Sequence, residues 1–227
     1  MNKKILFGIV GVLVLGLMSF ILLNKSDSTS GAQEIKSQQY GDQIVMTTNL
    51  NVTTFRNGEK IPHAADASAW QKAGEAKQPA WAYYNNDPAT AKTCGILYNW
   101  FAVNDPRGLA PEGWHIPTEE EWKKLGDFLS EKYPRDLTPI KSKTDWEKYG
   151  NGDNASGFNA FPCGIRGREG DYSQFGEATG WWSASQDRGG DKSHNSIYFS
   201  FSSKFREFTT GQNVRSGGLS VRCMKDA

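Results

Sequence analysis

The three cysteines, Cys94, Cys163 and Cys223, are the residues whose side chains could carry redox chemistry. They are widely separated single residues. In an exported protein an odd number of cysteines suggests one disulfide and one free thiol. Alternatively, all three are buried as small apolar residues. The sequence does not select the partners of a disulfide, and Cys223 is expected to be structural.

The three histidines, His63, His115 and His194, are the other side chains suited to catalysis or metal binding. They are far apart in the chain, and neither an HExxH motif nor another close ligand spacing joins them. His115 lies just before a predicted helix. Its favoured interpretation is a partly buried imidazole that is hydrogen-bonded to the backbone, so no catalytic residue is predicted.

Two groups of oxygen-bearing side chains could bind Ca²⁺. Neither group has the spacing of an EF-hand loop, and the Glu-Pro-Asn and Trp-Asn-Asp signatures of Ca²⁺-dependent lectins are absent. We therefore expect solvated turn residues and no cofactor, with a structural Ca²⁺ as the alternative. The two groups are Asn151, Asp153 and Asn154, and Asp187 and Asp191.

Aromatic side chains offer a binding chemistry instead. Trp181 and Trp182 are adjacent, so on a strand their side chains point to opposite faces. One would lie in the core, and the other could stack its flat apolar face on a sugar ring. Tyr83 and Tyr84 are candidates for the same role. The alternative is that most of these rings are core packing in a loop-rich domain.

Residues 96–122 contain the elements that must position these side chains. Thr118 and Glu121 form a capping box, in which each side chain accepts a hydrogen bond from the other's backbone N–H. Trp122 begins an apolar stripe on the helix that follows, and Trp114 is expected to bury just before it. This stretch is therefore interpreted as scaffold rather than active site.

Composition and patterning predict the fold class. The 227 residues include 24 Gly, 12 Phe, 8 Tyr and 8 Trp, which favours a loop-rich α+β domain over a helical bundle. Apolar and polar residues alternate over 197–202 and 219–223, as in half-buried antiparallel strands. The net charge of +1 and the absence of a basic patch give no support to nucleic-acid binding.

The N-terminal segment indicates export. Residues 5–23 carry no charge and follow Lys3 and Lys4, and at about 1.5 Å per residue they would nearly cross a hydrocarbon core of about 30 Å. We expect residues 1–23 to be a transmembrane anchor or uncleaved signal, 24–40 a flexible tether, and 41–227 one domain. The domain would face the periplasm or exterior from a bacterial membrane. The alternative is secretion after signal cleavage.

Four motifs carry a family resemblance: residues 95–122 (GILYNWFAVNDPRGLAPEGWHIPTEEEW), 156–167 (SGFNAFPCGIRG), 180–185 (GWWSAS) and 220–226 (SVRCMKD). They resemble the Fibrobacter succinogenes major paralogous domain, a family of exported bacterial proteins. WHIPTEEEW and VRC are more distantly similar to the formylglycine-generating, sulfatase-modifying family. That likeness implies a C-type-lectin-like α+β domain, with a twisted antiparallel sheet closed by the terminal strands and one main helix.

Three functions remain open at this point. The first is a membrane-anchored, non-catalytic domain that binds glycan or protein at the cell envelope. The second is an enzyme related to the formylglycine-generating oxidases, which use a reactive pair of their own cysteines and copper. The third is a structural envelope component. The oxidase requires two thiols within reach of each other, whereas the binding domain requires an exposed Trp or Tyr in a shallow groove.

Overall fold

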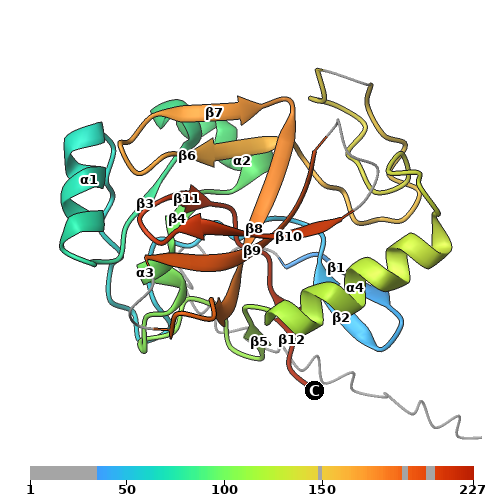
Figure 1. The fold of residues 1–227 in the computed structure, drawn as a ribbon, viewed down its shortest axis with the longest axis horizontal. Coiled ribbons are helices and arrows are strands. Elements are labelled where there is room, and N and C mark those ends of the chain that lie inside the picture. Colours follow the sequence, from blue (N-terminus) through green and yellow to red (C-terminus); the bar gives the residue numbers. More distant parts are fainter. Residues whose placement is uncertain (1–34, 148–149, 191–193, 203–207) are drawn as a thin grey trace, which may run out of the picture. The chain divides into compact units, whose positions relative to one another are not determined.

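Antiparallel pairing dominates the part of the chain that the computed structural model describes, which is residues 35–147, 150–190, 194–202 and 208–227 (Figure 1). The strands there form three sheets. The first sheet has the order β1 (Ser37–Tyr40), β2 (Gln43–Met46), β12 (Met224–Lys225), β5 (Trp114–His115). The second has the order β10 (Thr209–Val214), β9 (Asn195–Ser202), β8 (Ala178–Gln186). The third has the order β3 (Trp81–Ala82), β4 (Leu97–Asn99), β11 (Gly218–Leu219), β6 (Cys163–Arg166), β7 (Tyr172–Phe175).

One helix, α4 (Glu119–Lys132), is longer than the other described helices. Its start is fixed by the capping box: Thr118 Oγ1 accepts from the backbone N–H of Glu121 at 3.2 Å, and Glu121 Oε2 accepts from the backbone N–H of Thr118 at 2.8 Å. The remaining helices and 3₁₀ turns are α1 (Ala67–Glu75), η1 (Tyr84–Asn86), η2 (Pro88–Thr90), α2 (Ala91–Cys94) and α3 (Trp100–Val103).

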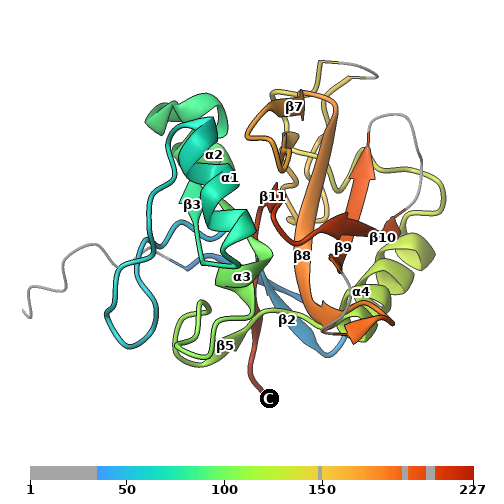
Figure 2. The ribbon, with the colours of Figure 1, turned by 60° about the vertical axis from the view of Figure 1, so that its left-hand side comes forward.

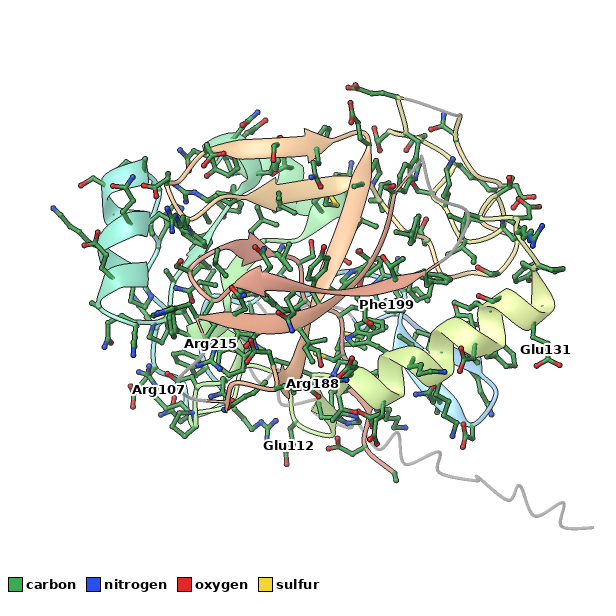
Figure 3. All side chains as sticks on the ribbon, viewed as in Figure 1. Arg107, Glu112, Glu131, Arg188, Phe199 and Arg215 are labelled. Atoms are coloured by element: carbon green, nitrogen blue, oxygen red, sulfur yellow. A yellow bond between two sulfur atoms is a disulfide. The ribbon has the colours of Figure 1, made fainter. Side chains whose placement is uncertain are left out.

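The apolar side of α4 packs on the sheet of β8 and β9 (Figures 1 and 2). Trp122 stacks on Phe199 of β9 with the ring centroids 4.9 Å apart, and Figure 3 shows Phe199 beside this helix. Gly126 permits the close approach, because a Cβ there would lie 3.2 Å from the Phe199 ring. The helix therefore closes one face of the second sheet.

Strand β8 separates two apolar clusters. Trp181 belongs to the cluster under α4, with Trp122 and Phe199. Trp182, the next residue, belongs to a cluster on the opposite face, with Tyr98 of β4 and Leu219 of β11. Because successive side chains of a strand point to opposite faces, this arrangement requires that β8 be covered on both sides.

The prediction of an α+β, C-type-lectin-like domain with one twisted sheet and one main helix is wrong for this fold. The described residues are mostly β-sheet, in three antiparallel sheets, with several short helices. The capping box and apolar stripe made α4 conspicuous, whereas α2 and α3 have 4 residues each and are too short to show a helical period. The terminal strands also do not close one sheet, since β11 and β12 lie in different sheets.

The predicted transmembrane helix, residues 5–23, lies outside the described residues, as does most of the predicted tether, residues 24–40. Within the described ranges, no helix is long and apolar enough to cross a membrane. The last residues of the tether form β1, which pairs with β2 through a turn at Gly41, where φ is 60°. Glycine adopts this left-handed conformation without steric cost.

Candidate functional site

The two tryptophans expected to contact ligand, Trp181 and Trp182, are both fully buried, with 0% of their surface exposed. Trp181 donates its indole N–H to Asn49 Oδ1 at 2.8 Å. Trp182 donates to the carbonyl of Tyr98 at 2.8 Å. The sequence argument assumed that one face of the strand was exposed. Because both faces of β8 are covered at these two residues, neither indole presents a surface to a ligand.

Tyr83 follows β3 directly, and Tyr84 is the first residue of η1. Tyr84 is buried against Tyr172 and Phe175, with ring centroids 5.1 and 4.9 Å away, and burial raises the pKa of its hydroxyl. Tyr83 is half-buried, with its ring edge against Trp81 at 5.1 Å. The structure therefore does not gather the four aromatic candidates into one site.

The residues expected to be structural lie in packed or hydrogen-bonded positions. Thr118 and Glu121 make both hydrogen bonds of the capping box. Trp122 and Cys223 are fully buried. Trp114 is half-buried on β5, where it pairs with the C-terminal strand β12.

His115 links the start of α4 to the C-terminal segment. Its Nε2 lies 3.0 Å from Glu121 Oε1, and its Nδ1 lies 2.8 Å from Asp226 Oδ1. The partners are thus two carboxylates, not the backbone that the sequence suggested. Burial raises the pKa of Glu121, but the hydrogen bonds from Thr118 together with His115 outweigh it and hold that pKa below its ordinary value.

The cysteines divide into one disulfide and one thiol. Cys94 and Cys163 are bonded, with their Cα atoms 5.4 Å apart. Cys223 is free and fully buried, and burial raises the pKa of its thiol, which disfavours the reactive thiolate. An oxidase of the kind considered would need two thiols within reach of each other. The disulfide leaves Cys223 without a second thiol.

No group of three His, Cys, Asp or Glu side chains within the described ranges is placed to hold a metal ion. The side chains considered for Ca²⁺ serve local turns instead: Asn151 accepts from the N–H of Trp146, Asp153 from that of Ala155, Asn154 from that of Asn159, and Asp187 from that of Gly189. Asp191 lies outside the described residues.

The hollow best suited to a ligand lies on the face of the β8–β9–β10 sheet that is turned away from α4. It has a volume of about 410 Å³, is partly open to solvent, and is walled by β6, β7 and β11. We call it the sheet groove. Cross-strand partners share a face of a sheet, so the register places Ser200 and its partner Thr209 on its floor together with Tyr198. Gln174 and Glu177 line its wall.

A second hollow, of about 470 Å³, borders His115 and the C-terminus. Several of its polar side chains contact one another: Lys124 pairs with Asp42 at 2.6 Å, and the His115 ring bonds to the carboxylates of Glu121 and Asp226. The described lining of the sheet groove carries hydroxyl and amide groups together with one acidic side chain, Glu177. The sheet groove is therefore the candidate site.

Sequence analysis missed the floor of this groove, although part of its signal was present. The alternation over 197–202 puts Tyr198, Ser200 and Ser202 on one face, and it was interpreted only as a half-buried antiparallel strand. The missing information is the register that places Gly180 and Gly211 beside Tyr198. No local pattern reveals that pairing.

These features define a disulfide-bonded domain of antiparallel sheets, with a groove lined by apolar, hydroxyl and amide groups and with no reactive thiol pair. The Fibrobacter succinogenes major domain matches residues 39–225, and the chain belongs to this family, as its motifs indicated. No match was found among curated proteins or among solved structures.

Proposed function

We propose that this protein is an exported, non-catalytic domain that binds a glycan or a protein at the bacterial cell envelope. The observation that carries the proposal is the sheet groove, whose volume of about 410 Å³ falls in the range of ligand sites and whose described lining combines apolar surface with hydroxyl and amide groups. The floor of the groove belongs to regular strands, which favours a preformed site.

Export is supported by two independent features. The Cys94–Cys163 disulfide fits an oxidising compartment, since such bonds are rare in reducing cytosol. The uncharged segment 5–23 behind two lysines is typical of an export signal. An oxidase of the formylglycine-generating kind is disfavoured by the burial of Cys223 and the pairing of the other two cysteines.

The experiment is a binding screen with the full chain, purified with its disulfide intact in a detergent that has no sugar head group. Purified envelope polysaccharides and individually purified envelope proteins are immobilised separately, and saturable binding is measured by surface plasmon resonance. Saturable binding to either class supports the proposal. Absence of saturable binding to both, or copper-dependent oxidation of a cysteine peptide at a steady rate, would overturn it.

A further inference from the structure

Tyr198 forms an aromatic platform on the floor of the sheet groove. Its ring lies across the sheet between two glycines: a Cβ on Gly211 would come within 2.8 Å of the ring, and one on Gly180 within 3.3 Å. The ring thus occupies space that side chains on β8 and β10 would otherwise fill. Tyr198 is half-buried and lines the groove, so part of its ring surface remains available.

Groups that both donate and accept hydrogen bonds surround this ring. Ser200 and Thr209 lie opposite each other with their hydroxyl oxygens 3.3 Å apart. The hydrogen bond between them uses one of the two hydroxyl protons, so the other proton and several lone pairs can bond to a ligand. The hydroxyl of Tyr198 makes no hydrogen bond to any described residue.

Gln174 contributes a side-chain amide to the wall of the groove, and its own backbone is strained. Its φ is 64°, in the left-handed region, and it sits on β7 between residues that pair with β6. The left-handed conformation is sterically unfavourable for a non-glycine residue, and residues held in it cluster at functional sites. Glycine would adopt the same backbone freely, so the fold alone gives no reason for a glutamine.

We propose that the sheet groove binds a neutral saccharide, with a pyranose ring stacked on Tyr198 and its hydroxyls bonded to Ser200, Thr209 and Gln174. This inference rests on the proposed function and names its ligand class. The apolar C–H face of a pyranose suits an aromatic ring, and its hydroxyls suit groups that donate and accept. An anionic sugar finds no cationic side chain among the described lining residues.

The test is isothermal titration of the full chain with neutral gluco-, manno-, galacto- and xylo-oligosaccharides, with galacturonic acid oligomers as the charged comparison. Three variants accompany the wild type. Tyr198→Ala removes the platform, and Gln174→Gly removes the amide while keeping a permitted backbone. Tyr83→Ala is the matched control, because it deletes another half-buried tyrosine that lies outside the groove. Melting temperatures are recorded for all of them.

We expect a neutral oligosaccharide to bind, with at least about tenfold weaker binding in Tyr198→Ala, which corresponds to about 1.4 kcal/mol. Gln174→Gly should also bind more weakly while melting no earlier than the wild type, and Tyr83→Ala should bind as the wild type does. Wild-type affinity in Gln174→Gly overturns the assignment, even where Tyr198→Ala fails to fold. Binding of the galacturonic acid oligomers alone overturns it as well.

The outcomes separate this inference from the function on which it rests. If no oligosaccharide binds but a purified envelope protein does, the saccharide assignment falls and the binding function stands. If a saccharide binds equally to the wild type, Tyr198→Ala and Gln174→Gly, the function stands and the groove is the wrong site. If neither class binds, both are wrong.

Discussion

Replacing Asn49 with alanine tests whether the hydrogen bonds of this buried side chain hold Trp181 in the core. We call Asn49 and its hydrogen-bond partners the hub. Asn49 is buried, and its Oδ1 accepts from Trp181 Nε1 at 2.8 Å and from Arg222 Nη2 at 3.0 Å. Its Nδ2 donates to the carbonyl of Cys94 at 3.0 Å. The side chain thus joins β8, the C-terminal segment and the disulfide.

The expected loss follows from the groups that alanine leaves without a partner. An unsatisfied buried donor or acceptor costs about 1–3 kcal/mol. Trp181 and the Cys94 carbonyl each lose the partner at Asn49, while Arg222 loses only part of its set because it still donates to the carbonyl of Phe158 at 2.6 Å. Burial disfavours the charged form of Arg222 and lowers the pKa of its guanidinium to about 9. We expect a loss of about 4 kcal/mol in the free energy of unfolding.

Thermal unfolding of the full chain, followed by near-ultraviolet circular dichroism, measures this loss. About 4 kcal/mol corresponds to a fall in melting temperature of roughly 8–16 °C for a domain of this size. Asn57→Ala is the matched control, because Asn57 is exposed in a turn and bonds only to its neighbour Glu59. A fall of less than about 3 °C in Asn49→Ala, similar to the control, would refute the hub.

Four further outcomes follow from the disulfide, the free thiol and the helix cap. Replacing Cys94 and Cys163 with serine should lower the free energy of unfolding by about 4 kcal/mol, because the disulfide joins residues 69 positions apart. An unchanged midpoint of urea unfolding would contradict this. Thiol titration should find one reactive group, Cys223, and only after denaturation. Thr118→Ala should lower stability by about 1 kcal/mol, measured by the same unfolding curve. The pKa of Glu121 is lowered from 4.5 in the folded protein. The ionised carboxylate therefore stabilises the folded state above pH 4.5, and this contribution is lost as the pH falls through the pKa of the folded protein. Below pH 4.5 the melting temperature of Glu121→Gln should therefore depend less on pH than that of the wild type. An equal slope of melting temperature against pH in the two proteins would count against the cap.

The start of α4 could be predicted because its signals are local. Thr118 and Glu121 are three residues apart, and both hydrogen bonds form as expected. The burial of Trp182 depends instead on strands that are distant in sequence, since its N–H bonds to the carbonyl of Tyr98. Trp146 lies in a stretch rich in polar residues and glycine, yet it is buried against Phe201, with ring centroids 5.4 Å apart. Such contacts follow from the sheet order, which no local pattern encodes.

Tryptophan and tyrosine have different places in this fold. Short strands and long loops leave this domain with few regular ladders, and indole N–H groups tie loops to strands in their place. Trp81 donates to the carbonyl of Ile61 and Trp100 to that of Ser183, at 3.0 and 3.1 Å. A tryptophan whose N–H bonds to backbone is fixed deep in the core. Tyr198 is one of the partly exposed aromatic residues; its hydroxyl bonds to no described residue, and its ring lines a groove.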